Sequence, residues 1–351
     1  MTRVAVVGAT GAVGREIVRI LDERDFPLEE LVLFASARSE GKRLEFRGSD
    51  ISVRPLEDGW HRGIDLALTS AGTPLSREIV PPAANDGTLI VDNSSAFRMD
   101  PNAPLVVPEI NADALSQHSG IVANPNCTAI TAVMPLGPLH RRFGLRSLVT
   151  SSYQSVSGAG MKGVRELAEQ IEKLHGQEEG LGYPEPESLP IGDVFPRTIA
   201  FNVIPHAEQF DPEGSGFTTE ELKMGAECRK ILGITDLPVA ATAVRVPVAV
   251  GHAVSVYATF ENAVTPQEAR EVLEAADGLL VMDDPEAGVY PTPLDSAGRD
   301  EVLVGRIRQP KDDPNALMFF SAGDNLRKGA ALNAVQIAEL LVEGVPRNQR
   351  S

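Results

Sequence analysis

Apolar residues in the first third of the chain form short, nearly continuous runs that alternate with segments of helical spacing. These runs predict strands at 4–7, 31–36, 64–72 and 88–95, and a helix is predicted at about 75–85. Strands that are apolar on both sides and alternate with helices are typical of a parallel sheet covered on both faces. We therefore expect an α/β chain that opens with a Rossmann-like parallel-sheet domain.

The hydrophobic pattern changes after Cys127, where apolar and polar positions begin to alternate strictly. The clearest case is "GHAVSVYATFEN", residues 251–262, which predicts a strand with one apolar face. That face carries Val254, Val256, Ala258 and Phe260. Such a strand suits a mixed or antiparallel sheet with helices on one side, so we expect a second, α+β domain with a mixed sheet.

A last helix with an apolar face is predicted from Leu326 onward. The residues on this face are Leu332, Val335, Ala338 and Leu341, at three-residue steps. Such a helix could pack back on the first domain and make that domain discontinuous. We therefore expect residues 1–126 with 325–351 to form the first domain and residues 127–324 the second.

The segment 175–196, "HGQEEGLGYPEPESLPIGDVFP", is rich in Gly, Pro and Glu. This composition predicts an excursion with little regular structure. We expect it to serve either as a dimer arm or as a mobile loop.

Composition and charge narrow the classes of function. The formal net charge of −17 argues against a nucleic-acid partner, because phosphate backbones recruit basic surfaces. The chain has no apolar run of roughly 18 residues and no signal-peptide pattern, so we expect a cytoplasmic protein without a membrane partner. In a reducing compartment the two cysteines would stay free thiols. An anionic substrate would require cations concentrated at one place on this acidic surface.

A glycine motif, "GATGAVG", follows the first predicted strand and opens a helix. Its glycines are Gly8, Gly11 and Gly14. Glycines at this position allow a tight turn and let a pyrophosphate approach the backbone at a helix N-terminus. The motif therefore indicates a dinucleotide, although a glycine turn without a ligand remains the alternative.

The end of the second predicted strand indicates which dinucleotide is bound. An NAD site usually has an acidic residue there for the ribose 2′-hydroxyl, whereas this strand ends in "ASARSEGKR" with Ser36, Arg38 and Ser39. Hydroxyls and a guanidinium suit a 2′-phosphate, which favours NADP. The alternative is that Arg38 is a solvated loop residue.

Cys127 stands at the start of a predicted helix in "NPNCTAIT", with Asn124 or Asn126 available as the cap. First-turn amides and the helix dipole would stabilise a thiolate, so we expect a lowered pKa for the Cys127 thiol. Cys228 lies in the middle of another predicted helix. We expect Cys228 to be a buried, unreactive side chain.

Six separated motifs occur in order across nearly the whole chain: "GATGAVG", "NPNCTAI", "SSYQSVSGAG", "EELK", "RVPVAVGHAVSV" and "DNLRKGAALNAVQIAE". In this set and order the chain resembles the aspartate-β-semialdehyde dehydrogenase family. The resemblance implies an NADP-dependent enzyme that interconverts L-aspartate 4-semialdehyde plus phosphate with 4-phospho-L-aspartate, on the route to lysine, methionine, threonine and isoleucine. It also implies a homodimer and makes the second domain the catalytic and dimerisation domain.

The same resemblance implies roles for residues of the motifs. Cys127 would be the nucleophile, His252 the acid and base, and Gln154 the group that orients the reacting centre. Arg245 would bind the substrate α-carboxylate and Glu220 the α-ammonium. The phosphate ligands would be Arg98, Asn126 and Lys223.

The cofactor would contact both the glycine motif and the segments that meet it. The expected cofactor residues are Gly8, Thr10, Gly11, Ala12, Val13, Gly14, Ser36, Arg38, Ser39, Ser70, Gly72, Ser157, Gly158 and Asn325. Asn325 is expected at the nicotinamide amide. No His/Cys/Asp cluster has metal-ligand spacing, so no metal is expected.

Phosphorylating oxidation of an aldehyde has requirements that these residues meet. A thiolate must form a hemithioacetal, a base must take its hydroxyl proton as hydride leaves, and phosphate must attack the resulting thioester. Among the six histidines, only His252 follows a glycine at the head of an alternating strand, close after Arg245. It is therefore the histidine that we expect at the site.

Several alternatives stay open on sequence grounds. Glu221 competes with Glu220 for the ammonium, Glu220 and Lys223 could form a surface ion pair, and Arg98 could be a surface residue. A related enzyme such as N-acetyl-glutamyl-phosphate reductase is the nearest rival, but its substrate has no free ammonium for Glu220. A catalytically silent NADP-binding regulator would have no use for the thiol and histidine.

Overall fold

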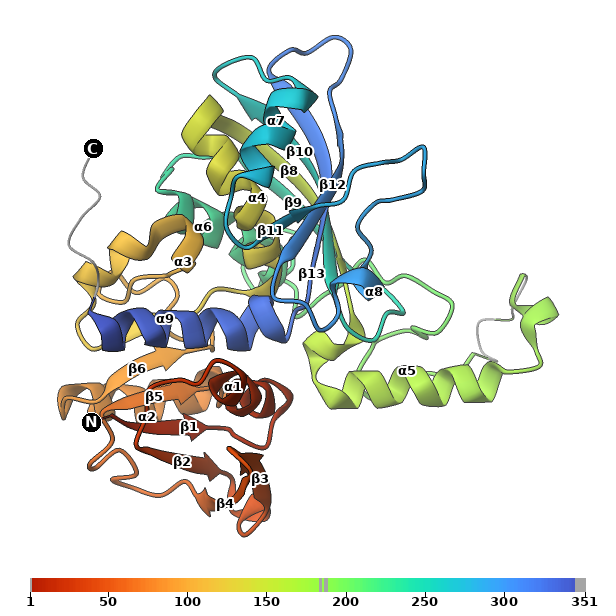
Figure 1. Ribbon diagram of the computed structural model, residues 1–351. Coiled ribbons are helices and arrows are strands. Elements are labelled where there is room, and N and C mark those ends of the chain that lie inside the picture. The colour runs from red at the N-terminus through yellow and green to blue at the C-terminus, as the bar shows by residue number, and fades with distance from the viewer. Residues whose placement is uncertain (1, 183–184, 186–188, 345–351) are drawn as a thin grey trace.

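The computed structural model describes residues 2–182, 185 and 189–344, which are arranged around two sheets (Figure 1). The first sheet has seven strands in the order β3-β4-β2-β1-β5-β6-β7. Its strands are β1 Arg3–Val7, β2 Glu30–Ala35, β3 Arg43–Phe46, β4 Ser49–Pro55, β5 Leu66–Thr69, β6 Leu89–Asp92 and β7 Ile121–Ala123. All neighbours are parallel except β3 and β4, which are antiparallel. The predicted Rossmann-like sheet is confirmed.

Helices cover this sheet on both faces, as continuous apolar strands require. The helices are α1 Ala12–Glu23, α2 Thr73–Asn85 and α9 Leu332–Glu343. Side chains of α1 and α9 share a core with Val4 and Val6. Side chains of α2 share the other core with Ala5 and Val7, the alternate positions of the same strand.

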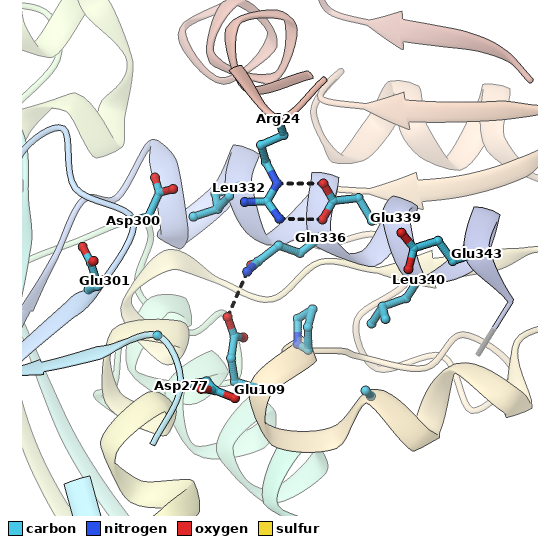
Figure 2. Close-up of a pocket in the computed structure, with 13 residues that line it drawn as sticks. Arg24, Glu109, Asp277, Asp300, Glu301, Leu332, Gln336, Glu339, Leu340 and Glu343 are labelled. Carbon is cyan, nitrogen blue, oxygen red and sulfur yellow. Dashed lines mark hydrogen bonds and ion pairs between the residues drawn. The ribbon is translucent and has the colours of Figure 1, made fainter. Parts of the chain in front are cut away.

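The C-terminal helix returns to the first sheet, as its apolar face predicts. It is preceded by a π-helical segment at Arg327–Ala331, so the helical region starts one residue after Leu326. Arg24, at the end of α1, donates from Nε and NH2 to the two carboxylate oxygens of Glu339 at 2.7 and 2.8 Å (Figure 2). This bidentate pair, together with the shared core, holds α9 against α1.

The second sheet is mixed and has six strands in the order β11-β12-β13-β10-β8-β9. They are β8 Leu145–Gln154, β9 Val239–Arg245, β10 His252–Phe260, β11 Leu279–Val281, β12 Val302–Arg308 and β13 Ala316–Gly323. Val254, Val256, Ala258 and Phe260 of β10 are buried, as their alternation predicts. The helices α4 Cys127–Phe143, α6 Thr219–Leu232 and α7 Pro266–Glu274 pack on this buried face.

The remaining elements are short, apart from one long helix. The helix α5 Met161–Leu174, which the sequence analysis did not predict, projects away from both sheets (Figure 1). The short elements are α3 Pro108–Asn111, α8 Pro293–Ser296 and the 3-10 segments Ala37–Ser39, Ala112–Gln117, Val156–Ala159 and Glu178–Gly182. The predicted excursion 175–196 follows α5, and its residues 183–184 and 186–188 lie outside the described part.

Within the described residues, no helix has the length and apolarity that a membrane span requires.

Candidate active site

Cys127 is the first residue of α4, and Asn126 is its cap. The Asn126 side-chain oxygen accepts from the backbone N–H groups of Thr128 at 2.8 Å and Ala129 at 3.3 Å. Asn124 instead donates to Asn93 and to the carbonyl of Ala330. Of the two caps that the sequence allows, the structure therefore uses Asn126.

The electrostatic environment of Cys127 differs from the expectation. Burial raises the pKa of the Cys127 thiol to about 12, and the nearby charge of Glu220 adds to this, while Arg98 and Arg245 act in the opposite direction. The predicted lowering of this pKa is therefore wrong. A helix N-terminus is worth less than the cost of burying a thiolate beside a carboxylate. Before any ligand binds, the group is a thiol.

Cys228 behaves as the sequence predicts. It is fully buried on α6, its thiol contacts the sulfur of Met224 at 3.6 Å, and burial raises its pKa to about 12. Because no solvent reaches Cys228, the half-buried Cys127 is the more accessible of the two free thiols.

His252 begins β10 and is completely buried. Burial, followed by the charge of Arg245, lowers the pKa of its imidazole to about 3, so the ring is neutral near pH 7. The backbone N–H of Ser155 donates to Nδ1 at 3.1 Å, and the Ser155 hydroxyl lies 3.1 Å from the same nitrogen. Nε2 is buried and has no hydrogen-bond partner among the described residues. Nδ1 is thus the ring nitrogen that contacts Ser155, and Nε2 is the one left without a contact of this kind in that part of the chain.

Close packing at two glycines locates the histidine and the thiol. A Cβ on Gly158 would lie 2.7 Å from NH1 of Arg245 and 3.2 Å from Nε2 of His252. A Cβ on Gly329, in the π-helical segment, would lie 2.9 Å from the Cβ of Cys127. The segment 157–160, which ends the motif "SSYQSVSGAG", thus lies directly against His252 and Arg245.

Gln154 and Arg245 end the neighbouring parallel strands β8 and β9. Gln154 donates from Nε2 to Glu220 at 3.0 Å, and Arg245 donates from NH1 to the carbonyl of Ser155 at 2.8 Å. Both side chains are buried. The structure therefore brings Gln154, Arg245 and Glu220 to one place beside Cys127.

Glu220 and Glu221 have different surroundings, which separates the two candidates for the ammonium. Glu221 completes a capping box with Thr218 and also accepts from the backbone N–H of Ala243, so its carboxylate is used by the fold. Glu220 is buried and accepts from Asn126, Thr128 and Gln154. Burial, followed by the charges of nearby carboxylates, raises the pKa of Glu220.

The expected phosphate ligands already have protein partners. Arg98 is buried and donates to the carbonyls of Asn93 and Asn124 and to Glu227 at 3.0 Å. The other oxygen of Glu227 accepts from the backbone N–H of Asn126 at 2.6 Å. The Arg98–Glu227 pair is therefore buried and joined to the residue before Cys127.

Lys223 forms an ion pair of its own, at the solvent side of this region. Its ammonium donates to both carboxylate oxygens of Glu208 at 2.7 and 2.5 Å. The ion pair that the sequence allows between Glu220 and Lys223 is not made. The acidic partner of Lys223 comes from a different loop.

The predicted cofactor loop has the close contacts that require glycine. A Cβ on Gly8 would lie 2.3 Å from the carbonyl oxygen of Ser70, and one on Gly14 would lie 2.2 Å from the carbonyl oxygen of Gly8. The backbone φ of 84° at Gly8 also favours glycine. No side chain caps the N-terminus of α1 at Gly11, so its first amides are open to a pyrophosphate.

The region expected for a 2′-phosphate contains three polar side chains besides the backbone. Ser39 is buried, and its hydroxyl lies 3.2 Å from that of Thr10, while Ser36 and Arg38 are exposed. Lys42 donates to the Ser39 hydroxyl at 3.4 Å. Lys42 therefore joins this group, although it was not among the predicted residues.

The other expected cofactor residues lie at helix starts and in buried loops. Gly72 has a φ of 80° and precedes α2, and Ala12 and Val13 form the first turn of α1. Ser157 and Asn325 are buried together, and Asn325 accepts from Ser155, Ser157 and the backbone N–H of Gly251. Asn325 thus ties the loop before His252 to the loop that contacts its ring.

The sequence analysis missed Ser155, Glu208, Glu227 and Gly329. Ser155 and Gly329 stand inside quoted motifs, so their position was a usable signal. The sequence contains no signal for Glu227 and Glu208, because each is one of many acidic residues. Only its contact with Arg98 or Lys223 in the structure distinguishes it. In the described part of the chain, no group of three or more His, Cys, Asp or Glu side chains could hold a metal ion.

A cleft of about 650 Å³ lies elsewhere, between α9 and the segments around Glu109 and Asp277 (Figure 2). Its ionisable lining is mostly acidic, with Arg24 as the basic exception. None of the predicted site residues lines this cleft. Its charge is also unsuited to an anionic substrate.

Comparison with known proteins matches both parts of the chain to one family. Residues 3–118 match the semialdehyde dehydrogenase NAD-binding domain, and residues 136–328 match the semialdehyde dehydrogenase dimerisation domain. The chain is 47% identical over 344 residues to aspartate-semialdehyde dehydrogenase of Aquifex aeolicus, covering 97% of this chain and 98% of that protein. The corresponding protein of Bacillus subtilis is 44% identical, with 96% of each chain covered.

A solved structure gives the same answer. The chain superimposes with a TM-score of 0.91 on aspartate semialdehyde dehydrogenase II from Vibrio cholerae complexed with ASA, at 40% identity and with 98% and 99% of the two chains covered. The expected resemblance is thereby confirmed over almost the whole length. The chain belongs to the aspartate-semialdehyde dehydrogenase family.

Proposed function

We propose that this protein is an NADP-dependent phosphorylating dehydrogenase that interconverts L-aspartate 4-semialdehyde plus phosphate with 4-phospho-L-aspartate. The single observation that carries the proposal is the arrangement around Cys127, where a half-buried thiol lies beside Gln154, Glu220 and Arg245. A buried carboxylate and a buried guanidinium at one site suit a substrate that carries both an α-ammonium and an α-carboxylate. An N-acetylated substrate would leave the Glu220 carboxylate buried without its cation.

Cys127 and His252 are suited to pass a proton as the covalent bond forms. The sulfur of Cys127 attacks the aldehyde carbon, the thiol proton passes to the aldehyde oxygen, and a hemithioacetal results. His252 exchanges the hydroxyl proton through Nε2, which has no hydrogen-bond partner in the described part of the chain. Both neutral forms of the ring have a partner in Ser155, since Nδ1 can accept from the backbone N–H or donate to the hydroxyl.

NADP fits the open turn at Gly8 to Gly14, where side chains would collide with the backbone. When bound, the cofactor supplies hydride transfer. Ser39, Lys42 and Arg38 would hold the 2′-phosphate, because Ser36 directly follows β2, where an NAD site usually has an acidic residue for the ribose 2′-hydroxyl. Phosphate then attacks the thioester carbon, the carbon–sulfur bond breaks, and the Cys127 sulfur takes back from His252 the proton that the hydroxyl gave up, so that Cys127 leaves as a thiol.

We propose the domain boundaries that the sequence predicts, 1–126 with 325–351 and 127–324. The core shared by α9, α1 and β1 supports the discontinuous first domain.

We also propose a homodimer formed through the face of the second sheet opposite α4, α6 and α7. Val149 and Tyr153 of β8 are 49% and 37% exposed on this face, and Tyr153 lies against Phe320 of β13. Two free thiols agree with a cytoplasmic location.

The proposal is tested by NADP reduction with purified protein and a panel of semialdehydes, each with and without phosphate. We expect turnover only with L-aspartate 4-semialdehyde and only when phosphate or arsenate is present. Cys127→Ala should abolish turnover and retain NADPH binding, whereas Cys228→Ala should retain both. Turnover that does not depend on phosphate would rule out the phosphorylating reaction.

A further inference from the structure

The carboxylate of Glu208 forms an ion pair with the ammonium of Lys223. Lys223 donates to both carboxylate oxygens, and the hydroxyl of Thr219 donates to Oε2 at 2.7 Å. Lys223 and Thr219 belong to α6, whereas Glu208 belongs to the loop before it. The Lys223 ammonium and the Thr219 hydroxyl, both on α6, therefore share one carboxylate as their acceptor.

The backbone at Glu208 is held in an unusual conformation. Its φ of 64° lies in the left-handed region, which residues with a Cβ rarely adopt. The loop is fixed beyond it, because the backbone N–H of Thr219 donates to the carbonyl of Gln209 at 2.8 Å. Strained residues of this kind often occur at functional sites.

The charge of Glu208 acts on the rest of the site. Burial raises the pKa of Glu208, but hydrogen bonds from Lys223 and Thr219 and the charge of Arg98 outweigh it, so that pKa is lowered and the group is ionised. Burial lowers the pKa of Arg245, and the charges of Glu220 and Glu208 oppose that change. Glu208 is thus an anion within electrostatic reach of both arginines.

The carboxylates that form ion pairs with the two cationic phosphate ligands, Arg98 and Lys223, differ in exposure. Glu227, the partner of Arg98, has a side chain only 1% exposed and cannot leave without abandoning a buried guanidinium. Glu208 is 39% exposed and Lys223 is 27% exposed. An ion pair at this exposure is worth little and exchanges readily with an anion from solution.

We propose that the Glu208 carboxylate binds Lys223 in the phosphate site when no substrate is bound. Phosphate, or the phosphoryl group of the acyl phosphate, must displace this carboxylate from Lys223. This inference rests on the proposed function, in which Lys223 binds phosphate. A singly charged anion offers Lys223 no more charge than Glu208 already does. A phosphate dianion offers more charge and a third oxygen, so Glu208 selects for dianions.

The test compares Glu208→Gln with the unmodified enzyme in the phosphorylating direction. We expect the KM for phosphate to fall about three- to fivefold, the size expected for losing a competing half-exposed ion pair, with the KM for semialdehyde nearly unchanged. Inhibition by sulfate, a second dianion, should strengthen by a similar factor. Glu208→Ala should move both constants in the same direction. Glu213→Gln removes an exposed charge from the same loop without touching Lys223 and is the matched control.

Lys223→Met separates this inference from the proposed function. A phosphate KM unchanged by Lys223→Met would refute phosphate binding by Lys223 itself. If Lys223→Met raises that KM, Glu208→Gln should have no further effect in the Lys223→Met background. A phosphate KM that rises in Glu208→Gln alone would mean that Glu208 holds Lys223 in place, and would overturn the proposal.

Discussion

Gln154 and Arg245 are register partners at the ends of the parallel strands β8 and β9. Each strand ends at the residue that enters the site, so a single sheet register places the two side chains beside each other. Gln154 reaches Glu220 and Arg245 reaches Ser155, next to His252. A shift of one residue in either strand would turn the site residue of that strand to the opposite face.

Arg245→Lys should impair the handling of semialdehyde and of acyl phosphate. Lysine cannot reproduce a bidentate pair with a carboxylate, so we expect kcat/KM for semialdehyde to fall at least about tenfold. The KM for phosphate should change little, because Arg98 and Lys223 are the proposed phosphate ligands. Steady-state kinetics with each substrate varied in turn would check this, and equal changes in both KM values would contradict the separation.

Alkylation of Cys127 should accelerate with pH well beyond neutrality. Because burial raises its pKa to about 12, the thiolate fraction rises about tenfold per pH unit below that value. We expect the iodoacetamide rate of the ligand-free enzyme to keep rising to at least about pH 9.5, with Cys127 labelled before Cys228 in peptide mass spectra. A plateau below pH 8 would contradict the raised pKa.

Arg98→Leu should destabilise the fold as well as weaken phosphate binding. Removing the guanidinium leaves Glu227 buried without its partner, which typically costs about 3–5 kcal/mol. Urea unfolding would show this loss in the free energy of unfolding. Adding Glu227→Leu should restore part of it, since the pair is then replaced by apolar side chains. An unchanged free energy of unfolding in Arg98→Leu would contradict a stabilising role for the buried Arg98–Glu227 pair.

Arg38→Ala should weaken NADP far more than NAD. Only NADP carries the 2′-phosphate, and one charge-assisted hydrogen bond is worth about 1.5–3 kcal/mol, or about ten- to a hundredfold in affinity. Arg43, an exposed arginine of the same region, pairs with Asp50 and provides the control variant Arg43→Ala. Dissociation constants for both cofactors would decide, and an equal loss for NADP and NAD would count against a 2′-phosphate contact.

Val149→Asp should shift the protein from dimer to monomer. The substitution places a charge in the middle of the uncovered sheet face, where it would be desolvated on association. Light scattering over a range of concentrations would measure the mass. Leu294→Asp, at an 82% exposed residue of α8, is the control. If Val149→Asp and Leu294→Asp both keep the mass of a dimer, the interface lies elsewhere.

The strands and the position of Cys127 were predictable because their signals are local. Apolar runs mark β1 and β5, alternation marks β10, and an Asn-Pro-Asn turn before helix formers marks the start of α4. The pKa of Cys127 was not predictable, because it depends on burial and on Glu220, which is distant in sequence. The Arg98–Glu227 pair joins residues 129 positions apart for the same reason. The helix α5 was not predicted, because the Gly and Pro residues of the segment 175–196 after it indicated irregular structure for this part of the chain.

Because α9 completes the core around Val4 and Val6, the first domain depends on a segment that is synthesised after all strands of the second sheet. Chains grow at roughly 5–20 residues per second, so β1 must remain without one covering helix until the whole second sheet has been synthesised. The second domain, encoded in between, has its whole sequence available earlier. A nascent chain of this protein would therefore expose a partly uncovered face of its N-terminal sheet to chaperones while the second domain is being synthesised.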